Sequence, residues 1–191
     1  MEEIMEKTNH LGLSRRSFFG CASGFILGSR WLDFTPLRLY EKINIQELKE
    51  EITPEEQKWV ENSTMAQELR SLFGKGYSCA ESLFMVSLRF MKESEELVWI
   101  ASSFGGGMYH QDLCGYLTSG LMAIGLRAGR LEKDRKGKKD HVKSLVNQYW
   151  EWWISQAPLH CSEIRKKGTS SKVCRRLGQM ASTKIEELIQ V

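Results

Sequence analysis

Proline is scarce in this sequence, with three residues in a chain of 191. So few prolines argue against linkers, and the length suits a single domain with a hydrophobic core. Apolar runs long enough to span a membrane are also missing. With 41% hydrophobic and 27% charged residues, the composition is that of an ordinary globular chain. These features predict one folded domain behind a short leader.

A strong charge imbalance is absent as well, because 27 basic residues face 24 acidic ones. The basic residues gather in two short segments, 133–139 and 165–167, without a zinc-finger, RRM or KH signature. We therefore expect no nucleic-acid binding. The segment 133–139 is predicted to be a solvated connection, and neither basic segment is assigned a role.

No Cys-x-x-Cys pair occurs among the five cysteines. This absence excludes the zinc-ribbon, rubredoxin, ferredoxin and thioredoxin signatures, and the lack of Cys-x-x-Cys-His excludes covalent c-type haem by that motif. A site shared by several cysteines must then be assembled by tertiary folding. Its ligands would come from separate parts of the chain.

Alternating strand patterns are missing from residue 35 onward, whereas apolar residues recur at helical spacing. The fold class predicted for residues 35–191 is all-α, a compact bundle of about five to six helices. Thr53 and Pro54 begin the first of them, and Gly74 follows its end. The expected helices cover about residues 54–72, 79–91, 94–103, 112–128, 140–156 and 171 onward.

The cysteines fall near predicted helix starts. Cys79 follows the capping residue Ser78, Cys114 is expected in the first turn of the central helix, and Cys174 near the start of the last helix. Cys161 is expected in the short connection after Pro158. Helix N-termini carry partial positive charge, so core-facing sulfurs there favour the thiolate and suit a metal or an iron-sulfur cluster.

Residues 1–34 are predicted to form a twin-arginine signal segment. Arg15 and Arg16 precede a bulky apolar residue, and an uncharged stretch from Ser17 to Ser29 follows. The chain would then be a partner of the twin-arginine export machinery and reach the periplasm or another extracytoplasmic space. A leader that is not cleaved would tether it to the membrane. Cys21 lies inside this segment and is not expected to belong to the functional set.

The glycine and cysteine pattern resembles a known family, the redox-active proteins named for their C-GCAxxG-C-C motif. The resemblance covers about residues 65 to 185. It rests on Gly76-Tyr77-Ser78-Cys79-Ala80, Phe104-Gly105-Gly106-Gly107-Met108, Cys114-Gly115 continuing to Gly120, Gly125-Leu126 and Gly129, and then Cys161 and Cys174. Tyr116 stands where the family usually has a small residue.

The resemblance implies that Cys79, Cys114, Cys161 and Cys174 are the candidate metal ligands. A similar domain occurs in a multihaem cytochrome whose cysteines are associated with an iron-sulfur centre, although this chain has no haem motif. The first hypothesis is therefore electron transfer or redox sensing with an iron-sulfur cluster, [2Fe-2S], and a redox partner protein. Backbone N–H groups at the cofactor-binding candidates would approach the sulfurs; these are Gly105, Gly106, Gly107 and Gly115.

Two other hypotheses remain open. The first is metal-free thiol-disulfide chemistry, with Cys79 as the nucleophile, one of the other three cysteines as its partner, and Cys114 as the second catalytic candidate. The other is an interaction domain without turnover, held together by zinc or by disulfides, in which His110 and His160 would be extra ligands. The reaction partner and the oligomeric state are left open.

Overall fold

The computed structural model describes residues 48–166 and 171–190. The predicted signal segment, residues 1–34, lies outside these residues. The described part is all-α, which confirms the predicted fold class, and it contains eight α-helices, a 3₁₀ turn and a π-helical turn. They are α1 (Pro54–Glu61), α2 (Thr64–Leu72), α3 (Cys79–Met91), η3 (Glu95–Leu97), α4 (Val98–Ser102), η4 (Gly107–Gln111), α5 (Gly115–Leu131), α6 (Arg135–Gln156), α7 (Cys161–Ile164) and α8 (Ser171–Ile189).

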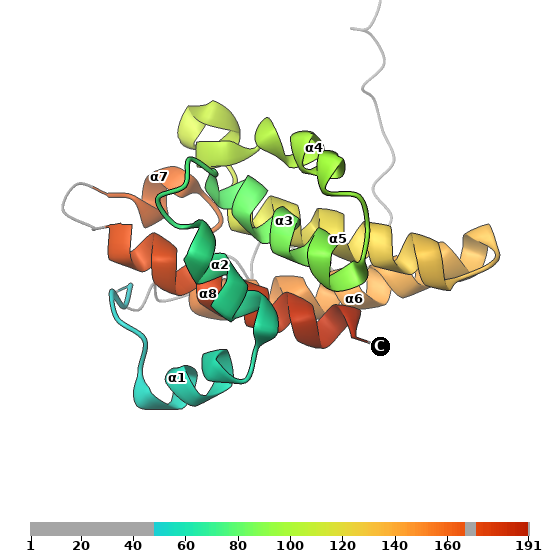
Figure 1. Ribbon diagram of the computed structural model, residues 1–191, viewed down its shortest axis with the longest axis horizontal. Helices are drawn as coiled ribbons and strands as arrows, with labels where there is room; N and C mark the ends of the chain where they lie inside the picture. Colours follow the sequence, from blue (N-terminus) through green and yellow to red (C-terminus); the bar gives the residue numbers. More distant parts are fainter. Residues whose placement is uncertain (1–47, 167–170, 191) are drawn as a thin grey trace, which may run out of the picture. The chain divides into compact units, whose positions relative to one another are not determined.

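The helix α5 is central, as the sequence predicted. It packs against α3, α6 and α8, and these four helices run roughly along the long axis of the view in Figure 1. Its small residues Gly115, Ser119 and Ala123 are buried, which lets neighbouring helices approach closely. On α8, apolar residues are also buried, at Leu177 and Ile185 among others.

The first expected helix is divided into α1 and α2. The chain leaves α1 at Asn62, and the Ser63 side chain caps α2 by accepting a hydrogen bond from Ala66 N–H. Glu186 of α8 accepts hydrogen bonds from Ser63 Oγ at 2.6 Å and Met65 N–H at 2.7 Å. A carboxylate from a distant element thus satisfies the new helix start, which is why local patterns did not predict the break.

The helix α6 begins earlier than expected, at Arg135. Asp134 caps it by accepting hydrogen bonds from the N–H groups of Lys136 and Gly137. The prediction that residues 133–139 form a solvated connection is therefore wrong for most of that segment. At the other end of α6, Tyr149 and Trp153 are fully buried in the core.

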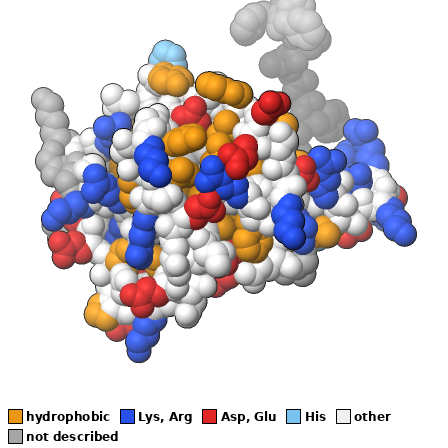
Figure 2. Space-filling model, in the orientation of Figure 1, with side chains coloured by type: hydrophobic (Ala, Val, Ile, Leu, Met, Phe, Trp, Pro, Cys, Tyr) orange, Lys and Arg blue, Asp and Glu red, His pale blue; other side chains and the backbone are white. Residues whose placement is uncertain are grey.

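Several large hydrophobic side chains stay exposed on α4 and η4. Trp99 is 73% exposed, Ile100 56% and Tyr109 74%. Figure 2 shows hydrophobic side chains at the upper edge of the molecule, where α4 and η4 lie in Figure 1. None of the described helices has the length and apolar character needed to cross a membrane.

Candidate functional site

Cys79 is the first residue of α3, as predicted. Ser78 caps this helix by accepting a hydrogen bond from Glu81 N–H, and the Glu81 carboxylate accepts one from Ser78 N–H at 2.7 Å. This reciprocal pair fixes the start of the helix and with it the Cys79 side chain, which is partly buried. The local sequence alone determines this part of the site.

Cys114 is the residue just before α5, not a residue of its first turn, because α5 begins at Gly115. Its side chain is 6% exposed. The N–H groups of Tyr116 and Leu117 lie near its sulfur and act to lower its pKa. Cys114 is the residue at the N-cap position of α5, and its side chain makes no capping hydrogen bond.

Cys161 is the first residue of α7, so its expected place in an irregular connection is wrong. An isolated antiparallel bridge joins Leu113 to His160. On either side of it, Cys114 N–H donates to Leu159 O at 2.8 Å, and Cys161 N–H donates to Asp112 O at 2.6 Å. The bridge places the backbone of Cys161 beside that of Cys114. Residue Cys161 is buried, with an exposed fraction of 5%.

Cys174 lies in the first turn of α8, which begins at Ser171 as expected. The thiol is partly buried and packs against the hydrophobic core. All four cysteines outside the leader therefore lie at or near the start of a helix. The sequence predicted this for three of them.

Charge on Cys79 acts on each of the other three cysteines. Burial raises the pKa of Cys114, Cys161 and Cys174, and negative charge on Cys79 raises each of them further. Charge on Cys161 also raises the pKa of Cys114 and Cys174. The described cysteines thus form one group, and Cys79 interacts with all the others.

These pKa shifts oppose the expected effect of the helix N-termini. For Cys114, burial raises the pKa far above its ordinary value of 9.0, although the N–H groups of Tyr116 and Leu117 act to lower it. The free-energy cost of removing a thiolate from water exceeds the stabilisation that the partial charges of the N–H groups provide. Cys114, Cys161 and Cys174 are therefore neutral thiols near pH 7 in the protein without a bound ion.

Three of the four candidate glycines allow close approach to the cysteine-bearing backbone. A Cβ at Gly115 would lie 2.4 Å from Cys79 Sγ, and a Cβ at Gly107 would lie 2.8 Å from Cys161 Cβ. At Gly105 it would lie 2.7 Å from Ser78 Cβ. No neighbour crowds Gly106, but its φ of +59° is one that side chains disfavour.

The segment that contains these glycines is left-handed. Gly106, Gly107, Met108 and Tyr109 all have positive φ, with values of 56° for Met108 and 60° for Tyr109. Residues with a Cβ are strained in this region, and such strain is concentrated at functional sites. This turn lies against Ser78 and Cys161, and so at the border of the cysteine group.

Arg165 was missed by the sequence analysis, which assigned no role to residues 165–167. Its side chain hydrogen-bonds to Cys161, and its positive charge opposes the rise in pKa of both Cys161 and Cys174. Arg165 lies four residues after Cys161, a spacing that places two side chains on one helix face. That spacing could have identified it, had the start of α7 been recognised.

Tyr116 is a second neighbour that sequence analysis did not assign to the site. Its side chain is buried beside Cys79, Cys114 and Cys174, and burial, followed by the charges of these cysteines, raises the pKa of its phenol. A Cβ at Gly178 would lie 2.7 Å from the Tyr116 hydroxyl. The ring therefore fills the space between α5 and α8.

The histidines of the zinc hypothesis do not join the cysteines. His160 Nδ1 pairs with Asp112 Oδ1 at 2.8 Å, and His110 is exposed. Among the described residues, no three His, Cys, Asp or Glu side chains are spaced to hold one metal ion directly. The cysteine group itself offers four sulfurs, backbone N–H donors and Arg165. Thiolates are soft donors of the kind that iron and zinc sites use.

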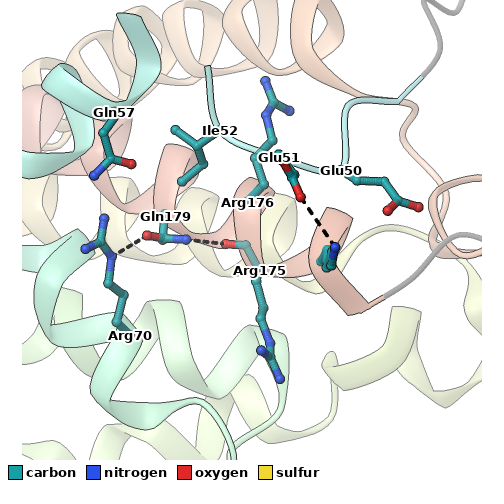
Figure 3. A pocket seen from close by; sticks show the side chains of 9 residues that line it. Glu50, Glu51, Ile52, Gln57, Arg70, Arg175, Arg176 and Gln179 are labelled. Atoms are coloured by element: carbon teal, nitrogen blue, oxygen red, sulfur yellow. Dashed lines mark hydrogen bonds and ion pairs between the residues drawn. The ribbon is translucent and has the colours of Figure 1, made fainter. Parts of the chain in front are cut away.

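A pocket of about 400 Å³ lies elsewhere, between the residues that precede α1 and one face of α8 (Figure 3). Some of the charged side chains that line it engage neighbouring lining residues. Arg70 donates to Gln179, and Lys172 pairs with Glu51 at 3.4 Å. The pocket contains none of the four cysteines. It does not contribute to the candidate redox site.

Comparison with curated proteins and with solved structures gave no match. Comparison with protein families found a match over residues 77–188 to the family described as "Putative redox-active protein (C_GCAxxG_C_C)". This span is more than half of the chain, and it contains all four cysteines of the site. The chain therefore belongs to the C_GCAxxG_C_C family of redox-active proteins.

Proposed function

We propose that this protein transfers electrons through an iron-sulfur cluster, [2Fe-2S], held by Cys79, Cys114, Cys161 and Cys174. The observation that carries the proposal is the gathering of four thiols, each from the start of a different helix, around Cys79. Thiolates are the usual protein ligands of such clusters. The crowding of Cys79 against Gly115 gives this grouping a specific geometry.

The high thiol pKa values support a site for a cation. Four thiolates in a buried group repel one another and lose hydration, so the protein alone keeps them protonated. The positive charge of iron would offset both the repulsion and the lost hydration, so a thiol that coordinates iron is deprotonated. Metal loading should therefore release protons from Cys114, Cys161 and Cys174.

The chemistry that the cluster supplies is the uptake of one electron from a reduced donor protein and its release to an oxidised acceptor, with no bond made or broken. The residues of this chain set how easily that electron is held. The N–H groups of Tyr116 and Leu117 and the Arg165 guanidinium favour negative charge on sulfur, and so stabilise the reduced form. Burial of Cys114 opposes them.

The test is anaerobic purification of the full chain after loading with iron and sulfide. The protein should be brown, with visible absorption and stoichiometric iron and sulfide. Serine at Cys79, Cys114, Cys161 or Cys174 should abolish or strongly change this absorption, whereas Cys21→Ser is the matched control and should retain it. A colourless, iron-free wild-type protein that still reduces disulfides would reject the cluster.

Thiol-disulfide exchange is the second candidate, and the position of Cys79 favours it. Cys79 is partly exposed, whereas Cys114 is buried and lies next to Gly115, against which the Cys79 sulfur packs. Cys79 would attack a substrate disulfide, forming a mixed disulfide and releasing one substrate thiol. Cys114 would then attack Cys79, forming a protein disulfide and releasing the second thiol. Two electrons pass to the substrate.

This candidate predicts a covalent intermediate that the cluster does not need. In Cys114→Ser the resolving thiol is missing, so a mixed disulfide between Cys79 and a small disulfide substrate should accumulate and be visible by intact mass. Cys79→Ser lacks the attacking thiol and should not form this adduct. Slow labelling of Cys79 and Cys114 alike in the metal-free protein would count against the mechanism.

A further inference from the structure

A surface patch that the cysteine site does not use lies on α4 and η4. It consists of Trp99 and Ile100 on α4 and Tyr109 on η4, and we call it the α4–η4 patch. Only residues 103–106 separate the two elements along the chain. Hydrophobic side chains over these elements are visible at the upper edge of Figure 2. Apolar residues that are exposed singly are common, but a group of large ones often marks an interaction site.

The patch belongs to a stretch of chain without charge. Residues 97–111 contain no Asp, Glu, Lys or Arg, in a chain of which 27% is charged. Residues 113–126 lack charge too, but none of them is exposed, so their burial explains it. Burial within the chain does not explain the α4–η4 patch, whose three side chains face solvent. An occupant that removes these side chains from water accounts for their character.

Backbone strain at the patch lacks compensation within the chain. Tyr109 has a φ of 60° and Met108 one of 56°, in the left-handed region that residues with a Cβ disfavour. The Tyr109 ring stays 74% exposed, so its own burial does not offset the strain. Strained residues of this kind gather at functional sites. An interface that buries the Tyr109 ring supplies the missing compensation.

A second copy of this chain is the occupant that fits the patch. In a two-fold dimer each patch meets its own copy, so charges at its centre would be brought close to like charges. A segment without charge avoids this cost. Exposed carboxylates flank the segment, from Glu95 and Glu96 on one side and Asp112 on the other. They oppose docking on anionic lipid head groups, whereas the rim of a protein interface is polar and hydrated.

The exposed area is that of the centre of a dimer interface. Tyr77 is 39% exposed and borders the patch, because Gly105 lies against both Ser78 and the Tyr109 hydroxyl. The rings of Trp99, Tyr109 and Tyr77 leave roughly 300–450 Å² exposed, if a whole aromatic side chain has about 150–250 Å². A stable dimer buries about 800 Å² on each partner. Three rings thus supply about half of this area, and aromatic residues contribute most to binding.

We propose that the protein forms a two-fold dimer through the α4–η4 patch. The patch is the outer side of the segment in which Gly105 lies against Ser78 and Gly107 against Cys161. The second copy therefore covers the cysteine group from this side. The inference does not depend on which chemistry the cysteines carry out.

Sedimentation equilibrium of the full chain tests the dimer. The wild type should be dimeric, and Trp99→Ala should raise the dissociation constant at least about 30-fold, the effect of removing one dominant interface residue. Ile100→Glu brings two like charges into the interface and should be monomeric at the same concentration. Trp150→Ala is the matched control, since Trp150 is an exposed tryptophan on α6, and should leave the dissociation constant unchanged.

Two results would overturn the proposal. One is a wild type that stays monomeric, and a monomer that sediments with phosphatidylglycerol vesicles would assign the patch to a membrane instead. The other is a dimer that Trp99→Ala and Trp150→Ala weaken equally, as association through the predicted signal segment would give. Because the three substituted residues are exposed, all variants should unfold in dilute protein at the urea concentration of the wild type. Strain at Tyr109 belongs to the monomer and is also measured in dilute protein, below the dissociation constant.

Discussion

Gly115 determines how closely Cys79 approaches the start of α5. In Gly115→Ala, the new Cβ would lie 2.4 Å from Cys79 Sγ and 3.0 Å from the Phe104 carbonyl oxygen. Because the carbonyl belongs to the backbone, the thiol has to move. We expect loss of iron binding and a stability decrease of about 1–3 kcal/mol from overpacking, measured by iron content and urea unfolding.

Gly125 provides the control for this prediction, since it lies on the same helix with no atom within 4 Å of an added Cβ. Gly125→Ala should keep the iron content and raise stability by about 0.5–1 kcal/mol, because alanine favours a helix interior. Equal iron binding by the two variants would show that the approach of Cys79 to Gly115 does not matter for the site.

At the residue scale, the sequence predicted the position of Cys79 better than that of Cys161. Cys79 was placed correctly because its capping box is encoded within four residues. Cys161 was misplaced because α7 is a single turn with no periodic pattern, and its position depends on the distant Leu113–His160 bridge. Arg165 was missed for the same reason.

At the scale of elements, the start of α2 depends on Glu186 of α8. This buried carboxylate accepts hydrogen bonds from Ser63 Oγ, Thr64 Oγ1 and Met65 N–H. Glu186→Ala leaves these donors without an acceptor and should lower the free energy of unfolding by about 2–4 kcal/mol. Chemical denaturation at pH 7 measures it. Glu187→Gln, at an exposed neighbouring position, should change stability by less than about 1 kcal/mol.

For the left-handed turn at η4, we predict a substitution that increases stability. Tyr109 is 74% exposed and has a φ of 60°, so it has strain without much burial. Tyr109→Gly should therefore raise stability by about 1 kcal/mol, because glycine adopts this conformation without strain. Tyr109→Ala keeps the Cβ and should give no such gain in thermal unfolding. A loss of stability in the glycine variant would mean that the exposed ring stabilises the fold.

Helices with long amphipathic patterns, α3, α5 and α8, were predicted close to their observed positions. The breaks between helices were not. Asn62 and Ser63 interrupt the first expected helix because Glu186 caps the new start, and the left-handed turn at Gly106 to Tyr109 brings Gly107 close to Cys161. Both depend on groups far away in the chain, which local propensities do not contain.

For the whole molecule, the pair of Glu56 and Arg176 predicts how stability depends on pH. Burial acts to raise the pKa of Glu56, but hydrogen bonds from Arg176 and Thr53 N–H, with the charges of Arg176 and Lys49, bring it below the ordinary 4.5. The stability from this pair is therefore complete above pH 4.5 and is lost as pH falls through the lowered pKa.

The variant Glu56→Gln isolates this contribution. It should be less stable than wild type near pH 7, and the difference should shrink below pH 4.5, where the wild-type carboxylate becomes protonated. Urea unfolding between pH 3 and pH 7 measures it. Glu55→Gln is the control on the same turn, where the carboxylate is exposed, and its pH profile should follow that of wild type.

Export of the whole protein remains a proposal from the sequence. Arg15 and Arg16 are replaced by lysine in the full chain, and the protein is then located by cell fractionation. Twin-arginine export predicts that the double variant stays in the cytoplasm. If it is exported as efficiently as wild type, the pair of arginines is not a signal.

The four cysteines are spread over the chain from Cys79 to Cys174, and the last of them belongs to the C-terminal helix. During synthesis the site cannot exist until α8 has emerged and packed against α5. A translation product that ends before Cys174 lacks at least one sulfur. A loaded centre would therefore report that synthesis has passed Cys174 and that α8 has packed against α5.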